Sequence, residues 1–275
     1  MAHYQPTYGA RETGRNVRAF VRANKAMFWS MLKPLMAAML MVVAFELFFL
    51  LASGTSSMLF SLLYGYLYMA LAVNWHRAVI LGPNSYTAVD LINPRHNEMV
   101  FLGMMYGIPV LTFLICMGFG IVIGIAGMLH PAVWVVGSLL IVGFSVWLTL
   151  RWSFYFPARA VNTPITLKEA YNLSRGYVWK MICAHFFATW RITLLIFGLI
   201  LLPMAVGFIP LMFEGWRTYL SGTGEIVGIM FFVVLYLVGL LPVYLYMLPL
   251  LSVMWVNILS NYYLHAKRAQ ITKNS

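Results

Sequence analysis

The residues LRWSFYFPARAVNTPITLKEAYNLSRGYVWKM, from Leu150 to Met181, decide the topology of this chain. Apolar segments long enough to cross a bilayer lie on both sides of this basic stretch. Together with Arg191, which follows it, the stretch supplies six of the 18 Lys and Arg residues. Connections rich in Lys and Arg lie on the cytoplasmic side of membrane proteins, so we expect the basic stretch at the cytoplasmic surface.

The composition is that of an integral membrane protein. Of the 275 residues, 62% are hydrophobic and only 9% are charged, and the mean hydropathy is +0.84. Soluble domains carry about 25% charged residues. The net charge is +11. On a membrane protein such an excess meets anionic lipid heads, so we expect anionic phospholipids, and no nucleic acid, as partners.

The apolar segments predict an all-α fold, a polytopic membrane helix bundle of six transmembrane helices in three hairpins. The first two outer turns are short and uncharged, so the helices that they join are antiparallel neighbours. The sixth segment exceeds the roughly 20 residues of one crossing, so we expect a kink at Pro242 or Pro249. Its aromatic and polar residues from Trp255 to Tyr263 suit a membrane interface. The expected spans are about 35–52, 57–80, 100–128, 132–156, 190–213 and 226–264.

This layout sorts the charges almost completely. Of the 18 Lys and Arg residues, 17 fall on one side, and only Arg217 falls on the other. Both termini are therefore expected in the cytoplasm. The chain divides into a cytoplasmic arm (1–34), a membrane domain (35–264, which includes a cytoplasmic cuff at 157–189) and a basic tail (265–275).

Amphipathic helices are expected on the cytoplasmic face. In the arm, Arg11, Arg15, Arg18 and Arg22 share one helical face, with apolar residues between them. Such a helix either lies on the membrane surface or is an ordinary solvated helix that leads into the first span. In the cuff, Thr166 and Glu169 form a capping-box pattern, which predicts a helix from about Leu167 through Lys180 towards Arg191.

The basic stretch also carries a family resemblance. Its motifs are Arg-x-Ser-Phe-x-x-Pro-Ala at 151–158, Leu-x-x-Ala at 167–170 and Ser-Arg-Gly-x-x-Trp-Lys at 174–180. The chain resembles the YciC-like bacterial inner-membrane proteins and the membrane domain of some glycerophosphodiester phosphodiesterases. The resemblance implies a six-helix domain in a bacterial inner membrane. It does not imply phosphodiesterase activity, because the catalytic barrel of those enzymes is a separate domain.

We expect the cations of the basic stretch to contact lipids or partner proteins. The Gly-rich faces of the spans suit contact with partner membrane proteins or with further copies of the chain. The function that follows is a non-enzymatic membrane protein, an accessory or assembly subunit. The residues expected to make lipid or partner contact are Arg151, Arg159, Lys168, Arg175 and Lys180.

A second possibility is a transporter or lipid-handling permease. Glu46 is the only acidic residue deep in a span, where a charge is costly and often functional. Its candidate partners are Tyr64, Tyr66 or Tyr68 of the neighbouring span, and the alternative role for Glu46 is a structural hydrogen bond. A wider intramembrane polar site would include Glu46, His76 and Arg77.

The sequence offers no catalytic or metal-binding pattern. It lacks Gly-x-Ser-x-Gly, His-Glu-x-x-His and a phosphate loop. Cys116 and Cys183 fall at different depths and are not spaced for zinc. We therefore expect no enzyme activity, no metal and no cofactor.

Overall fold

The structure is a computed structural model that describes residues 4–53, 58–83, 88–127, 131–212 and 243–274. This part of the chain is helical and contains no strand. Six of its helical segments are long and apolar enough to cross a membrane, which confirms the predicted fold class. The segments are Lys25–Glu46, Met58–Leu81, His96–Ile125, Ala132–Ala160, Val178–Gly198 and Leu245–Thr272.

The order of the elements follows the predicted hairpins. The helices are α1 (Ala10–Ala23), α2 (Lys25–Ser53), α3 (Met58–Leu81), α4 (His96–Gly127), α5 (Pro131–Trp152), α6 (Tyr155–Ala160), α7 (Leu167–Leu173), α8 (Val178–Met212), the π-helix η2 (Val243–Met247) and α11 (Leu248–Asn274). Helix α2 packs on α3, and α4 packs on α5. Helix α8 packs on η2 and α11, and the connection between them lies outside the described residues.

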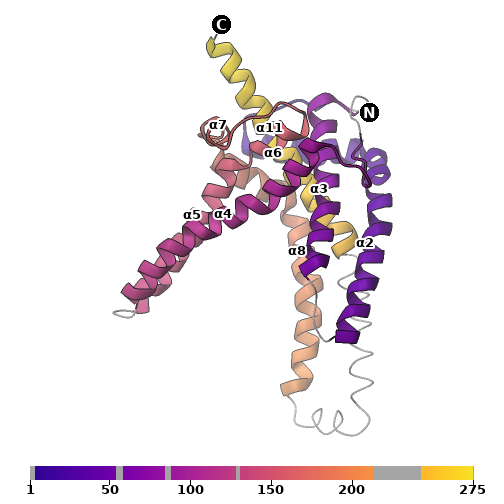
Figure 1. Cartoon of the computed structure of the whole chain (residues 1–275), viewed down its shortest axis with the longest axis vertical. Coiled ribbons are helices and arrows are strands. Elements are labelled where there is room, and N and C mark those ends of the chain that lie inside the picture. The colour runs from indigo at the N-terminus through magenta and orange to yellow at the C-terminus, as the bar shows by residue number, and fades with distance from the viewer. Residues whose placement is uncertain (1–3, 54–57, 84–87, 128–130, 213–242, 275) are drawn as a thin grey trace.

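Both ends of the chain, and the short helices α6 and α7, lie at one end of the molecule (Figure 1). We use the name charged end for this end of the molecule, which holds both chain termini, α6 and α7. From it, α4 and α5 run together away from the other long helices (Figure 1).

The buried core lies at the charged end. Of the candidate spans, 61% of the one in α11 and 50% of the one in α3 are buried, but only 17% of those in α4 and α5. Trp75, Phe154 and Tyr262 are among the largest side chains that are fully buried there. The α4–α5 hairpin therefore presents mostly apolar surface to its surroundings, as a lipid-facing hairpin does.

Helix α1 is amphipathic, as predicted, but protein covers its apolar face. Val17 and Phe20 are 0% and 5% exposed, and α1 packs against α8 and α11. Gly14 allows the close approach, because a Cβ there would lie 3.0 Å from the carbonyl oxygen of Ala184. The apolar face of this helix is therefore buried in protein, and α1 does not bury it in the membrane surface. Helix α2 then begins at Lys25 and continues unbroken through Pro34.

The capping box is confirmed, but the helix after it is shorter than predicted. The Thr166 side chain accepts from the Glu169 N–H, and the Glu169 carboxylate accepts from the Thr166 N–H. Helix α7 ends at Leu173, however, and α8 begins only at Val178. Gly176 in the intervening turn has φ +84°, a left-handed conformation that glycine adopts readily. A single helix from Leu167 towards Arg191 was wrong for this reason.

The last span, for which a kink at Pro242 or Pro249 was predicted, contains a π-helical turn. Helix η2 runs directly into α11, and Pro249 is the second residue of α11. Pro242 lies outside the described residues. The run that was assigned to a membrane interface is instead protein core, since Asn261 and Tyr263 are 0% and 1% exposed.

Candidate functional site

Arg151 is a structural residue of the charged end. It is only 6% exposed, and its guanidinium carbon lies 3.9 Å from the ring centroid of Tyr171. The Ser174 hydroxyl donates to the Arg151 carbonyl oxygen at 2.7 Å. These contacts hold α7 against the end of α5 and use the face of the guanidinium within the protein.

Arg159 and Lys180 are also engaged inside the chain. The Arg159 guanidinium lies 5.0 Å from the ring centroid of Tyr155 and donates to the Asn97 side-chain oxygen at 3.4 Å. The Lys180 ammonium lies 2.9 Å from the ring centroid of Tyr8, in the N-terminal arm. Of the five predicted contact cations, Lys168 and Arg175 are exposed, Arg159 and Lys180 are half-buried, and Arg151 is buried.

The proposed intramembrane residues do not form one site. The Tyr64 hydroxyl donates to the Glu46 carboxylate at 3.0 Å, which is one of the predicted hydrogen bonds. Tyr66 donates instead to the Leu91 carbonyl oxygen. His76 lies twelve residues beyond Tyr64 on α3, about 18 Å along the helix. Glu46 is therefore separated from His76 and Arg77.

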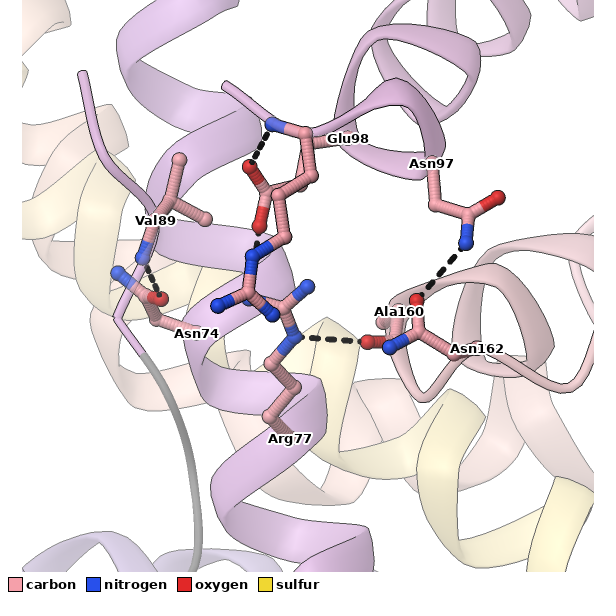
Figure 2. A network of polar contacts seen from close by, with 8 residues as sticks. Asn74, Arg77, Val89, Asn97, Glu98, Ala160 and Asn162 are labelled. Carbon is pink, nitrogen blue, oxygen red and sulfur yellow. Dashed lines mark hydrogen bonds and ion pairs between the residues drawn. The ribbon is translucent and has the colours of Figure 1, made fainter. Parts of the chain in front are cut away.

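Arg77 forms a buried ion pair with Glu98 at the charged end (Figure 2). The distance is 2.8 Å, and the two side chains are 3% and 1% exposed. Arg77 Nε also donates to the Ala160 carbonyl oxygen at 2.8 Å. The Glu98 carboxylate accepts from the Arg95 N–H at the start of α4, at 2.7 Å. One pair of charges thus joins α3, α4 and α6.

Neutral hydrogen bonds extend this network (Figure 2). The Asn74 side-chain oxygen accepts from the Val89 N–H at 2.8 Å, and Asn97 donates to the Asn162 side-chain oxygen at 2.9 Å. His76 and Ser260 bond at 2.7 Å and link α3 to α11. The network is a fastening between helices.

Asn261 makes a second set of hydrogen bonds between distant segments, which the sequence did not predict. Its side-chain oxygen accepts from the Tyr4 hydroxyl at 3.1 Å and from the Thr7 N–H at 2.8 Å. Its side-chain nitrogen donates to the Thr7 carbonyl oxygen at 2.8 Å. The N-terminal arm is therefore held on α11, more than 250 residues away in the chain.

The strongest candidate for a binding site is a cavity of about 320 Å³ between α1, α2, α8, η2 and α11. We call it the cationic pocket. Among the described residues, four cations and no acidic residue line it: Arg18, Arg22, Lys25 and Arg191. The rest of the lining is apolar or aromatic: Val21, Phe28, Ala188, Trp190, Ile192, Tyr246, Leu250 and Met254.

The cations of the pocket stand close enough to repel one another. Partial burial, and then the positive charges of Arg191 and Arg22, hold the pKa of Arg18 below its usual value. Arg18 also donates to the Phe187 carbonyl oxygen. The Arg191 guanidinium lies 5.2 Å from the ring centroid of Trp190. A cluster of like charges with no carboxylate in its lining favours an anionic ligand.

The pocket lies where charge gives way to apolar surface. Arg191 is the last charged residue of α8, and residues 192–212 of that helix carry none. Leu194, Leu195 and Phe197, just beyond it, are 53–60% exposed. Sequence reasoning assigned Arg18 and Arg191 to separate basic segments, because they lie 173 positions apart in the chain and this separation hides their proximity.

A second cavity, of about 530 Å³, lies between α7 and α11. Glu169, Asn172 and Lys267 line it together with apolar residues, so its charge is mixed. Glu46 lines neither cavity. Within the described residues, no group of three or more His, Cys, Asp or Glu could hold a metal ion.

Comparisons of the chain with protein families, with characterised proteins and with solved structures give no match.

Proposed function

We propose that this chain is a non-catalytic, multi-pass membrane protein that binds the phosphate groups of anionic phospholipids in its cationic pocket. One observation carries the proposal: in the part of the chain that the structure describes, four cations and no acidic residue line a cavity whose remaining walls are apolar or aromatic. A phospholipid combines the same two properties, a negative head group joined to apolar chains.

The arrangement of cations and apolar residues in the pocket fits a lipid that enters from the bilayer. Arg22 and Arg191 are exposed and can meet a phosphate. Leu250 and Met254 supply apolar wall for the start of the acyl chains. Beyond the pocket, the chains can continue along the apolar surface of α8.

We further propose a bacterial inner membrane as its location, with both termini in the cytoplasm, and an accessory or assembly role beside other membrane proteins. The positive-inside distribution of the 18 Lys and Arg residues supports the orientation. The resemblance of the basic stretch to YciC-like proteins supports the location. The sparsely buried α4–α5 hairpin offers surface for partner helices.

The alternative, a permease that uses Glu46, receives less support. Glu46 accepts a hydrogen bond from Tyr64 and does not line either cavity. We therefore assign Glu46 a structural role between α2 and α3.

The test is lipid retention by the purified protein. Native mass spectrometry would count the anionic lipids that remain bound after exchange into phosphatidylcholine nanodiscs. We expect Arg22→Gln/Arg191→Gln to lose them. The matched control, Lys168→Gln/Arg175→Gln, removes two exposed cations of the basic stretch and should keep them. Equal loss of bound lipid in both variants, or loss only in the control, would show that the lipids bind outside the pocket.

A further inference from the structure

We infer that the cationic pocket selects a phospholipid whose head group is a phosphate monoester over lipids with singly charged diester head groups. This inference rests on the proposed function and names the ligand class of the same site. It follows from the charge, the lining and the size of the pocket.

The positive charge of the pocket favours a ligand that carries more than one negative charge. A phosphate diester carries one and would leave most of the four cations of the lining uncompensated. A phosphate monoester carries about −1.5 to −2 at pH 7 and offers three acceptor oxygens. The guanidinium groups of Arg22 and Arg191 can each donate two parallel hydrogen bonds to such a group.

The described lining offers no partner for the positive charge of a zwitterionic head group. Choline or ethanolamine carries a positive charge, and no carboxylate of the described residues lines the pocket. Aromatic faces could replace a carboxylate, but all three aromatic residues of the lining are engaged. Phe28 is 2% exposed and packs edge-on against Trp75 and Tyr246. Arg191 lies over Trp190, and Tyr246 stacks on Trp29 with centroids 5.4 Å apart. A cationic head would therefore meet four like charges with no compensating partner.

The size of the pocket also favours a small head group. About 320 Å³ is at the lower end of the roughly 300–1,000 Å³ that is usual for ligand pockets. A phosphate monoester is the smallest phospholipid head, since nothing extends beyond the phosphate. It lets the phosphate reach the guanidinium groups while the glycerol and the first methylenes fill the apolar part.

The experiment compares two anionic lipids in phosphatidylcholine nanodiscs at equal total lipid charge. Phosphatidic acid is the monoester probe, and phosphatidylglycerol is the diester probe. The bound fraction is measured by native mass spectrometry at pH 8 and at pH 5. At pH 8 we expect phosphatidic acid to bind about tenfold more tightly than phosphatidylglycerol, which corresponds to about 1.4 kcal/mol.

The pH dependence separates the two ester classes. The second pKa of a phosphate monoester lies near about 6, so phosphatidic acid is mostly dianionic at pH 8 and mostly monoanionic at pH 5. Its advantage should shrink at the lower pH, whereas phosphatidylglycerol does not titrate in this range. Arg22→Gln/Arg191→Gln should abolish the advantage, and Lys168→Gln/Arg175→Gln should preserve it.

The outcomes distinguish this inference from the proposed function. Equal, pocket-dependent binding of both lipids would overturn the monoester preference and leave the lipid-binding function standing. Binding of neither lipid, in a protein whose helical circular dichroism matches the parent, would overturn both. Displacement of phosphatidic acid by millimolar inorganic phosphate would also overturn the inference, because a free phosphate would then be the ligand. Retention that does not change in the pocket variant would overturn it as well.

Discussion

Breaking the ion pair between Arg77 and Glu98 should destabilise the protein more than any other single charge change. Glu98→Gln keeps the volume of the side chain and its acceptor for the Arg95 N–H. It leaves the guanidinium of Arg77, which is 3% exposed, without its carboxylate. Removing one partner of a buried pair costs about 3–5 kcal/mol of unfolding free energy, and we expect a loss of that size.

The matched double variant separates charge from packing. Arg77→Met/Glu98→Gln removes both charges, so no uncompensated ion remains buried. It still loses the hydrogen bond from Arg77 to the Ala160 carbonyl oxygen, and a bond to a charged group is worth about 1.5–3 kcal/mol. The double variant should therefore be more stable than either Glu98→Gln or Arg77→Met alone.

The assay is equilibrium unfolding of the detergent-solubilised protein by sodium dodecyl sulfate, followed by tryptophan fluorescence. Trp75 is fully buried and lies two residues before Arg77 on α3, so its environment should report the opening of this region. Two results would refute the reasoning. One is a loss below about 1 kcal/mol in Glu98→Gln. The other is a double variant whose loss equals the sum of the two single losses.

Three further predictions follow from the helix contacts. Gly14→Leu should cost at least about 1–3 kcal/mol in the same assay, because even its Cβ would lie 3.0 Å from a backbone oxygen of α8; an unchanged midpoint would contradict this. Hydrogen bonds from Thr166 hold the pKa of Glu169 below its usual 4.5, so the stability that they give α7 is present above that pH and is lost as the pH falls through the lower folded value. Amide exchange in α7, corrected for the intrinsic rate, should rise on acidification in the parent and less in Glu169→Gln. Glu46→Gln keeps an acceptor for Tyr64 and should leave the unfolding midpoint and lipid retention unchanged; loss of either would give Glu46 a role beyond this bond.

The sequence was sufficient for the six membrane spans and their order. Apolar length predicts the six spans, and the Thr166–Glu169 pattern predicts the start of α7. It was less successful where a tertiary contact decides the outcome. The apolar face of α1 carries the pattern of a membrane-surface helix, and only the packing of Gly14 against α8 shows what covers it.

The candidate site was harder to predict, because lysine and arginine side chains serve two purposes at a membrane surface. Arg151, with its guanidinium over Tyr171, and the exposed Arg175 belong to the same basic stretch. Nothing in their sequence neighbourhood separates the structural cation from the free one. The pocket depends on α1 and α8 meeting across 169 residues, as the bond from Arg18 to Phe187 illustrates. No local pattern carries that information.

The central position of α11 has a consequence for biosynthesis. Helix α3 reaches its end at Leu81, but α11, which covers it through contacts such as that between His76 and Ser260, ends only at Asn274. At about 5–20 residues per second, a ribosome needs roughly 10–40 s to make the chain between these two points. During that interval the nascent chain holds the polar side of α3 uncovered in or beside the bilayer. A ribosome that stalls before α11 would release a protein whose hairpins are inserted but whose core has never closed, which is the kind of product that membrane proteases remove.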